Sequence, residues 1–315
     1  MAQANPLEGK LVVLLGGAGY FGSYIAAELL RRGARLRIAG LHPEKAFGLK
    51  PQANLGQLQF ARCNVTDRRS VEQVMQGADA GVYLVGAFSG NQQGLQADGA
   101  GYAAQAAAAQ GAGSFVYVSA IGADAADEKS EYARTKGDGE RQVLDAFPRA
   151  TIVRPSILFG EDDKFINMFA GLVSAFPAMP VFGADAELQP VWVDDAAQAV
   201  CNALADANAH GGQTYELGGP DVITMEELHR RIAGAQARQR SFVKVPDAIS
   251  ALFADLPLTP MNADQWTLLK RGSTVSGTYP GIEKLGVSPK PLSLFLDRWM
   301  VRYRKHGRFG DSRAA

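Results

Sequence analysis

The chain has 315 residues, of which 47% are hydrophobic and 20% charged, and its 32 Lys and Arg residues balance its 32 Asp and Glu residues. This composition excludes a disordered or collagen-like chain, and the zero net charge provides no overall attraction to nucleic acid. The two cysteines, Cys63 and Cys201, lie far apart and outside any Cys/His cluster, so we expect no disulfide framework and no metal site, in a reducing cytoplasm.

Strand and helix patterns alternate along the first half of the chain. Residues 11–15, LVVLL, form an unbroken apolar run that is typical of a strand covered on both faces, and the helical segment 22–32 that follows ends before Gly33. The same criteria predict strands at 35–39, 58–63, 82–87, 115–120, 151–160 and 215–219, and helices at 67–77, 99–110 and 129–146. This alternation predicts an α/β fold with a doubly wound parallel sheet of the Rossmann type.

The pattern also predicts how the chain is divided. Residues 1–160 are expected to form the dinucleotide-binding core, with residues 190–220 returning to it. Residues 161–189 and 221–315 contain many prolines and show weaker periodicity. We assign them to a smaller C-terminal lobe over the carboxyl edge of the sheet, which is where ligands of such folds bind and where a substrate or partner would be contacted.

A glycine-rich loop separates the first strand from the first helix. The segment GGAGYFG spaces Gly16, Gly19 and Gly22 three residues apart. Glycines permit a tight turn and a close approach of the backbone, so a diphosphate can rest against the amides of the helix N-terminus. Since the loop follows a buried strand and opens a βαβ unit, the context predicts a site for NAD(H) or NADP(H) rather than a turn without a ligand.

The end of the second predicted strand bears on which of these cofactors binds. A site for NAD(H) usually has Asp or Glu there, to bind the ribose hydroxyls, whereas this chain has Ala39, Gly40 and Leu41. His42 and Lys45 follow, and either side chain could pair with a 2′-phosphate, so we expect NADP(H) in preference to NAD(H). The alternative is that both are solvated loop residues and the cofactor is NAD(H).

A tyrosine and a lysine are spaced for acid–base chemistry. Tyr132 and Lys136, in YARTK, are four residues apart on a predicted helix, so their side chains lie on one face. A cation beside a phenol stabilises the phenolate and lowers its pKa from about 10, which makes Tyr132 a candidate for proton transfer. Such pairs also occur by chance on helix surfaces, but this one follows the fifth strand of a nucleotide-binding sheet.

Together these segments resemble the extended and atypical short-chain dehydrogenase/reductases. The shared features are GxxGxxG, YxxxK, an RPS-x-x-x-G strand from Arg154 to Gly160 and a VDD-A segment at 193–196. The longer segments GGAGYFGSY, VSAIGAD, YARTKGDGE, PVWVDDAAQAV and YELGGPDVITMEEL, with LLKRGSTVSG-x-x-PGIEKLGV near the C-terminus, are similar to the subgroup of the nucleotide-binding accessory subunit of mitochondrial complex I and its bacterial and ubiquinone-biosynthesis relatives. The resemblance extends from residue 16 to about residue 287.

The resemblance implies roles for particular residues. Tyr132 would transfer the proton, Lys136 would hold the nicotinamide ribose, and Ser119 would orient a substrate carbonyl. Family enzymes usually carry a Ser or Thr after the fifth strand, often the later member of a Ser pair, whereas here Ala120 and Ile121 follow Ser119, which either orients a carbonyl or only bonds the backbone. Besides Gly16, Gly19, Gly22, His42, Lys45 and Lys136, the expected cofactor contacts are Tyr20, Phe21, Asn64, Val65, Val85, Gly86, Ala87, Pro155 and Ile157.

For three charged residues and one amide, a structural role competes with a functional one. Arg154, Asp194 and Asp195 could be mistaken for an ion-pair site or a catalytic dyad, but in the resembled family they are mainly structural, and we expect the same here. Asn64 either approaches the adenine, as the polar residue after the third strand does in the family, or is an ordinary loop residue.

The C-terminal region contains two apolar patterns. Leu292, Phe295, Leu296, Trp299 and Tyr303 recur at helical spacing beside Arg298, Arg302, Arg304 and Lys305, which fits an amphipathic helix that either packs on its own lobe or docks on a membrane surface or a partner. If this helix docks on a membrane surface or a partner, a second apolar stretch could form the mouth of a pocket for a hydrophobic substrate such as a quinone precursor. Its residues are Phe165, Met168, Phe169, Leu172 and Phe176.

Location and function follow as two expectations. The chain begins without a basic and hydrophobic leader, and Asn167, Pro177 and Pro180 interrupt the apolar stretch 165–182, so we expect a cytoplasmic protein without a secretory signal or membrane span, free or at the inner face of the membrane. The first hypothesis is an NAD(P)-dependent oxidoreductase acting on a carbonyl or alcohol of a hydrophobic substrate. The second is a weakly catalytic or non-catalytic nucleotide-binding accessory or assembly protein of respiratory complex I or of ubiquinone biosynthesis.

Overall fold

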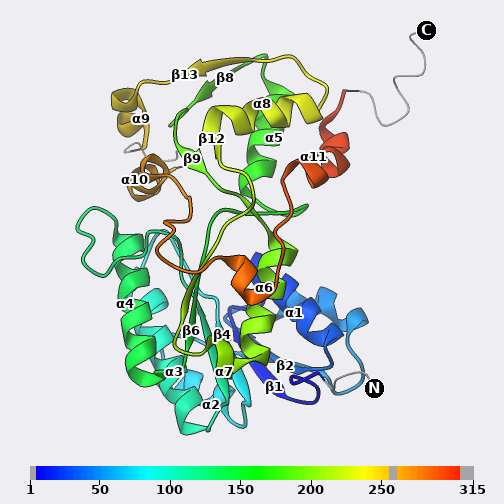
Figure 1. Ribbon diagram of the computed structural model, residues 1–315, viewed down its shortest axis with the longest axis vertical. Coiled ribbons are helices and arrows are strands. Elements are labelled where there is room, and N and C mark those ends of the chain that lie inside the picture. The colour runs from blue at the N-terminus through cyan, green and yellow to red at the C-terminus, as the bar shows by residue number, and fades with distance from the viewer. Residues whose placement is uncertain (1–4, 255–260, 306–315) are drawn as a thin grey trace. The chain divides into compact units, whose positions relative to one another are not determined.

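The computed structural model describes residues 5–254 and 261–305, which fall into two compact units (Figure 1). Unit 1 consists of Met1–Pro155, Val193–Leu217 and Val275–Ser288. Unit 2 consists of Ser156–Trp192, Gly218–Thr274 and Pro289–Ala315. Each unit is built from three separate pieces of chain.

Unit 1 is an α/β layered structure around one parallel sheet. Its elements are β1 (Leu11–Leu15), α1 (Tyr20–Arg31), β2 (Arg35–Gly40), η1 (Pro43–Gln52), β3 (Leu58–Arg62), α2 (Arg68–Met75), β4 (Ala80–Tyr83), η2 (Gln93–Asp98), α3 (Gly99–Ala109), β5 (Ser114–Val118), α4 (Glu131–Ala146), β6 (Thr151–Pro155), α6 (Val193–Ala205), α7 (Ala207–His210), β11 (Thr214–Leu217) and η3 (Ile282–Leu285). The strands follow the order β11-β6-β5-β4-β1-β2-β3, with every neighbouring pair parallel. This confirms the predicted doubly wound Rossmann sheet.

The residues explain why the elements form where they do. All five residues of β1 are buried, because helices α2, α3 and α4 pack beside one another on one side of the sheet while α1 packs against α6. Asp67 caps α2 and Ser130 caps α4, each accepting a hydrogen bond from a backbone N–H of the first turn. Gly33, with φ of 82°, lets the chain turn back after α1 into β2.

Two predicted strands are shorter than the sequence indicated. Strand β4 ends at Tyr83 instead of continuing to residue 87, because its partner β1 ends at Leu15, which pairs with Tyr83. The predicted strand 151–160 was wrong as a single strand: β6 ends at Pro155, which cannot donate a ladder hydrogen bond. Residues Leu158–Phe159 form β7, which pairs with β10 (Val191–Trp192).

A π-helical turn, η2, precedes α3. The hydroxyl of Tyr83 donates a hydrogen bond to the carbonyl oxygen of Leu95 at 2.5 Å, and that of Tyr117 donates to the carbonyl oxygen of Gln96 at 2.8 Å. Both rings are fully buried, and burial raises the pKa of each phenol well above its usual range, so both remain donors. Two buried tyrosines from neighbouring strands therefore support the widened turn.

Residues 275–288 belong to unit 1, which corrects their assignment to the C-terminal lobe. The buried carboxylate of Glu216 in β11 accepts a hydrogen bond from the Ser276 N–H at 2.6 Å, and the Glu216 N–H donates to the carbonyl oxygen of Pro280 at 3.0 Å. The side-chain amide of Asn202 donates to the carbonyl oxygen of Leu285 at 2.7 Å. These long-range bonds, to the edge strand β11 and to helix α6, have no local sequence signal, which is why periodicity did not place the segment.

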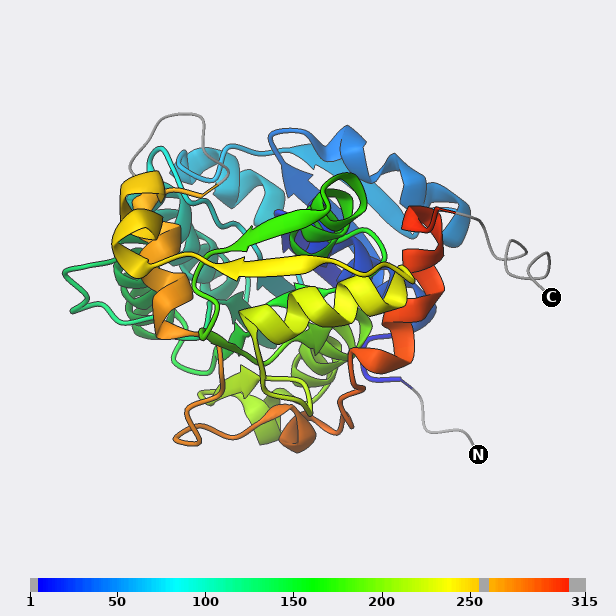
Figure 2. The ribbon, with the colours of Figure 1, turned by 90° about the horizontal axis from the view of Figure 1, so that it is seen from above.

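Unit 2 contains short strands and helices around its own apolar core. Its elements are β7, α5 (Phe165–Ala175), β8 (Ala178–Val181), β9 (Glu187–Leu188), β10, β12 (Ile223–Thr224), α8 (Met225–Ala235), β13 (Ser241–Lys244), α9 (Asp247–Ala254), α10 (Ala263–Arg271), α11 (Ser293–Met300) and η4 (Val301–Tyr303). Strands β8 and β13 run parallel and side by side, as Figure 2 shows. Helices α5 and α8 contribute Ile166, Val173, Leu228 and Ile232 to the core.

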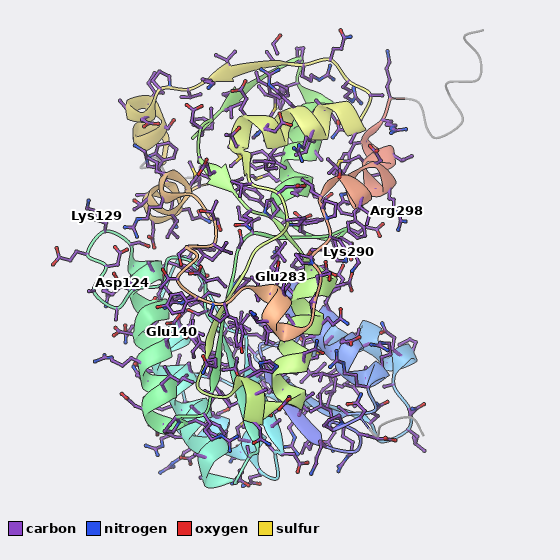
Figure 3. The ribbon with its side chains drawn as sticks, viewed as in Figure 1. Asp124, Lys129, Glu140, Glu283, Lys290 and Arg298 are labelled. Carbon is purple, nitrogen blue, oxygen red and sulfur yellow. The ribbon has the colours of Figure 1, made fainter. Side chains whose placement is uncertain are left out.

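The C-terminal helix packs on its own unit, so its apolar face is not the docking surface that the sequence allowed. Phe295 and Trp299 are 9% and 6% exposed, and the Phe295 ring stacks on Trp192 with 3.9 Å between centroids. The guanidinium of Arg302 donates to the carbonyl oxygen of Glu161 at 2.8 Å, which adds a polar attachment. Arg298, labelled in Figure 3, lies on this helix. None of the helices in residues 5–254 and 261–305 combines the length and the apolar composition that a membrane crossing needs.

Candidate functional site

The glycine loop lies at the carboxyl end of β1, where the strand order reverses between β1 and β4. Gly16 has φ of 85°, and a Cβ built on it would lie 3.0 Å from Val85 Cγ2. A Cβ on Gly22 would lie 2.6 Å from Gly17 Cα, because helix α1 starts directly against the loop. Glycine is therefore required at 16 by conformation and at 22 by space.

The start of α1 has the properties that a diphosphate needs. Gly19 caps the helix without a side-chain hydrogen bond, and its first turn contains no acidic residue. The first N–H groups of an α-helix have no acceptor within the helix, and the helix dipole adds partial positive charge there. Tyr20 is half-buried and Phe21 is buried in this turn. These features fit a dinucleotide with its diphosphate at the helix N-terminus.

The ends of β2 and β3 bring a cation beside the expected ribose position. The register of the two strands pairs Gly40 with Arg62, which is exposed. His42 and Lys45 are also exposed, in and beside η1, but the His42 ring lies 3.1 Å from the carboxylate of Glu44. Arg62, which the sequence analysis did not name, is thus a third exposed cation near the end of β2, and the Glu44 carboxylate is a partner of His42.

The loops after β3 and β4 carry the remaining expected cofactor residues of unit 1. Asn64 is exposed, and its side-chain oxygen accepts hydrogen bonds from the N–H and hydroxyl of Thr66 at 3.2 and 2.9 Å, so this oxygen serves a local turn. Val65 is buried. After β4, the Val85 side chain lies 3.0 Å from where a Cβ on Gly16 would be. Gly86 is exposed and Ala87 is half-buried.

Lys136 is turned into unit 1. Its side chain is 2% exposed, and its Nζ donates hydrogen bonds to the carbonyl oxygens of Val118 at 2.9 Å and of Val85 at 3.3 Å. Burial lowers the pKa of Lys136 to about 7, an effect that the carboxylate of Glu140 partly offsets. The lysine therefore changes charge near neutral pH while tying the ends of two neighbouring strands to helix α4.

Tyr132 lies in the first turn of α4, one helical turn before Lys136. The Lys136 Nζ is 5.9 Å from the centroid of the Tyr132 ring, so the predicted pair shares one side of the helix. The ring of Phe88, on the loop after β4, stacks on Tyr132 with 4.3 Å between centroids and 15° between planes. The sequence analysis did not identify Phe88, although an aromatic residue three positions after Val85 was a visible signal.

Ser119 directly follows β5 and is 3% exposed. Its N–H donates to the carbonyl oxygen of Val153 at 2.8 Å, but its hydroxyl has no hydrogen-bond partner among the described residues. The interpretation in which this hydroxyl bonds only the backbone is therefore wrong. A buried hydroxyl left without a partner costs about 1–3 kcal/mol, and such groups in native proteins often belong to binding sites.

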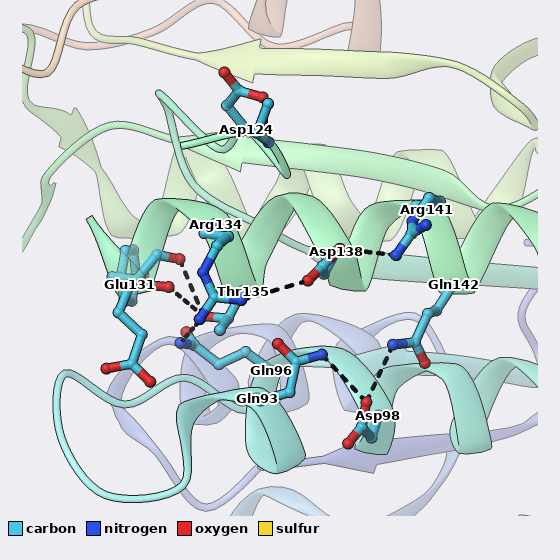
Figure 4. A network of polar contacts seen from close by, with 12 residues as sticks. Gln93, Gln96, Asp98, Asp124, Glu131, Arg134, Thr135, Asp138, Arg141 and Gln142 are labelled. Carbon is cyan, nitrogen blue, oxygen red and sulfur yellow. Dashed lines mark hydrogen bonds and ion pairs between the residues drawn. The ribbon is translucent and has the colours of Figure 1, made fainter. Parts of the chain in front are cut away.

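A second buried polar atom, on Gln96, lies near the loop after β4. The Gln96 amide group donates to the Thr135 hydroxyl at 2.9 Å and to the side-chain oxygen of Gln92 at 3.2 Å (Figure 4). Its own side-chain oxygen has no partner among the described residues. A Cβ on Gly86 would lie 3.5 Å from both this oxygen and the Lys136 Nζ. The side chains of Gln96 from η2 and Lys136 from α4 thus both approach Gly86.

The other expected site residues divide between the two units. The guanidinium of Arg154 pairs with Glu140, as expected of a structural residue, and Pro155 is half-buried at the end of β6. Asp195 is buried in α6. Ile157 belongs to unit 2, where it packs against the apolar core of that unit. On α5 and just after it, Met168, Leu172 and Phe176 are 38%, 37% and 53% exposed.

Comparison with known proteins agrees with this geometry. A model of an NAD(P)H-binding family matches residues 16–169. The chain is 28% identical to NADH dehydrogenase (ubiquinone) 1 alpha subcomplex subunit 9, mitochondrial, of Arabidopsis thaliana, over 98% of this chain and 82% of that protein. It is 27% identical to a ceramide reductase of Caulobacter vibrioides, over 75% of this chain and 74% of that protein.

Solved structures provide a fold comparison. The UDP-glucose 4-epimerase of Thermus thermophilus in complex with NAD superposes with a TM-score of 0.71, over 94% of this chain and 99% of that chain, at 18% identity. At this identity the likeness concerns the fold alone. The parallel sheet, the glycine loop and the match over residues 16–169 together show that the chain has a Rossmann core similar to that of this NAD(P)H-binding family.

Proposed function

We propose that the protein is an NAD(P)-dependent oxidoreductase that interconverts a carbonyl and an alcohol on a hydrophobic substrate. One arrangement carries this proposal: the Lys136 Nζ lies 2.9 Å from the carbonyl oxygen of the residue before Ser119 and 5.9 Å from the ring of Tyr132. A proton donor and a cation thereby lie together near the end of β5, and Ser119, with its buried hydroxyl, directly follows that strand end. This is the set of groups that carbonyl reduction needs.

The residues have separate tasks in this reaction. When bound, the nicotinamide supplies or accepts the hydride at the substrate carbon. The Tyr132 hydroxyl gives its proton to the carbonyl oxygen during reduction and recovers a proton from solvent, and it accepts the alcohol proton in the reverse direction. Lys136, when charged, stabilises the phenolate, and the Ser119 hydroxyl donates a hydrogen bond to the reacting oxygen.

The cofactor that we propose is NADP(H). Gly40 leaves no carboxylate at the end of β2, where an NAD(H) site usually has one, and the paired position on β3 is Arg62. Arginine binds a phosphate through two parallel, charge-assisted hydrogen bonds, and these are stronger than its hydrogen bond to an uncharged ribose hydroxyl. Lys45 adds a second cation nearby in sequence, whereas the carboxylate of Glu44 faces His42.

Two substitutions test the oxidoreductase proposal. Tyr132→Phe removes the transferable proton and should abolish turnover of a carbonyl or alcohol, while the affinity for NADPH measured by calorimetric titration stays nearly unchanged. Ser119→Ala should lower kcat by roughly 100-fold, because one donor to the developing oxyanion is lost. Equal activity in Tyr132→Phe and the parent protein would reject this function.

A second candidate function is that of a nucleotide-binding accessory or assembly protein of a respiratory complex. It is supported by the names of the relatives, which include a mitochondrial NADH dehydrogenase subunit that aligns with 98% of this chain. In this case the protein sits at the inner face of the membrane, and isolated membranes should retain it until salt or detergent is added. A wholly soluble fraction, or a strong effect of Tyr132→Phe on growth, would favour the enzyme instead.

A further inference from the structure

Phe88 covers the residue to which we assign proton transfer. It lies on the loop after β4, is 41% exposed, and stacks nearly parallel to Tyr132 with 4.3 Å between ring centroids. A ring this exposed contributes little to the core of unit 1. The ring lies against the phenol ring of Tyr132, on the loop between β4 and η2.

The loop that carries Phe88 is fastened to α4 on both sides of it. Before Phe88, the carbonyl oxygen of Val85 accepts a hydrogen bond from Lys136 Nζ at 3.3 Å. After Phe88, the Gln92 side-chain amide donates to the Glu131 carboxylate at 3.2 Å. The stack on Tyr132 lies between these attachments. The ring is therefore held in position by contacts that do not depend on its own packing.

This position makes Phe88 a neighbour of whatever reaches the Tyr132 hydroxyl. The hydroxyl is at the rim of a ring that stacks on Phe88, so a carbonyl that accepts its hydrogen bond comes within a few ångströms of the Phe88 ring. Aromatic rings favour flat apolar partners, in offset or edge-to-face contact, by about 0.5–1.5 kcal/mol beyond the area that they bury. A small or anionic substituent gains little from this surface.

We propose that Phe88 is a specificity-determining residue, which selects carbonyl or alcohol substrates with a flat, apolar group attached to the reacting carbon. This inference rests on the proposed oxidoreductase function and narrows its substrate class. An alternative role, in which Phe88 only steadies Tyr132, makes a different prediction: loss of the ring would then reduce the rates of all substrates by the same factor.

The kinetic test compares two methyl ketones that differ in the second substituent. With NADPH, the parent protein should prefer acetophenone over 2-butanone in kcat/KM by tenfold or more. Phe88→Ala should lower kcat/KM for acetophenone at least tenfold, mainly through KM, and leave 2-butanone nearly unchanged. Phe88→Tyr should keep the preference. An unchanged ratio in Phe88→Ala, or an equal loss for both ketones, would overturn the inference.

Phe47→Ala is the matched control. Phe47 is 46% exposed, lies in unit 1, and packs edge-to-face on Phe60 at 4.8 Å, so its removal is the same kind of change at a comparable exposed ring. The preference for acetophenone should persist in this variant. If it falls as it does in Phe88→Ala, the effect comes from general loosening and the inference fails.

A binding measurement separates this inference from the proposed function. The 19F signal of 4-fluoroacetophenone should broaden when NADPH-loaded parent protein or Phe88→Tyr is added, and remain sharp with Phe88→Ala. If this pattern appears without any turnover, Phe88 selects the ligand and only the oxidoreductase function is rejected. If no protein broadens the signal, or Phe88→Ala broadens it equally, the inference about Phe88 is rejected whatever the activity.

Discussion

Arg154 donates two hydrogen bonds to Glu140, from Nε to Oε1 at 2.8 Å and from Nη2 to Oε2 at 2.6 Å. The pair joins β6 to α4, and its side chains are only 12% and 11% exposed. The Tyr279 ring lies 4.7 Å from the guanidinium carbon, so segment 275–288 completes the environment of the pair. Helix α4, which carries Tyr132 and Lys136, is thereby attached to the sheet by a two-pronged ion pair.

Breaking this pair on one side should destabilise the protein strongly. Glu140→Met leaves a buried guanidinium without its partner, which costs about 3–5 kcal/mol. The double substitution Glu140→Met with Arg154→Met should lose less than the sum of the two single changes, since no unpaired charge remains. Urea denaturation at pH 7 measures all three variants. Additive losses would mean that the two side chains do not depend on each other.

The stability of the protein should rise with pH through the titration of Lys136. Its pKa is lowered from 10.5 to about 7 by burial, so between pH 7 and pH 10 the unfolded chain holds a proton that the folded protein has released. The free energy of unfolding therefore increases with pH in this window. Below pH 7 both states are protonated, so this gain in stability is absent.

Lys136→Met should remove that part of the slope. Urea titrations at pH 7, 8, 9 and 10 compare the two proteins, and the other groups near the ammonium, Glu140, Tyr117 and Tyr132, are unchanged in the variant. The parent should gain more stability over this range than Lys136→Met. Parallel pH profiles would show that the lysine keeps its ordinary pKa in the folded protein.

Arg62 should decide the preference for NADP(H). Arg62→Gln removes a charge-assisted hydrogen bond worth about 1.5–3 kcal/mol, so the affinity for NADPH should fall roughly 10- to 100-fold while that for NADH stays the same. Calorimetric titration with both cofactors measures this. Arg68→Gln removes the same charge from a helix-surface residue paired with Glu72 and should leave both affinities unchanged. Equal weakening for NADPH and NADH would place Arg62 away from the 2′-phosphate.

Gly22→Ala should impair cofactor binding. The added methyl group would lie 2.6 Å from Gly17 Cα, so the start of α1 must move away from the glycine loop. We expect at least tenfold weaker binding of NADPH and a lower Tm. Gly234→Ala, one residue before the end of α8 and with no atom within 4 Å of the new Cβ, should bind normally and gain up to about 1 kcal/mol of stability. Normal NADPH affinity in Gly22→Ala would contradict the assigned role of the loop.

Local patterns in the sequence determined the alternating architecture and the glycine loop. Unbroken apolar runs such as residues 11–15 are typical of strands covered on both faces, and the glycine spacing between such a strand and a helix is typical of a dinucleotide site. The four-residue spacing of Tyr132 and Lys136 similarly sets them on one side of a helix before any tertiary contact is known. These are short-range properties, and sequence alone carries them.

Only the tertiary structure decided which residues meet across long separations. The parallel register pairs Gly40 with Arg62, the loop after β4 brings Phe88 onto Tyr132, and β5 ends with Ser119 buried and its hydroxyl unbonded among the described residues. The apolar stripe of α11 is buried against unit 2, and residues 275–288 return to unit 1. Each outcome depends on packing between segments that are distant in the sequence. Helical or strand periodicity shows which face of an element is apolar, but not which other segment packs against that face.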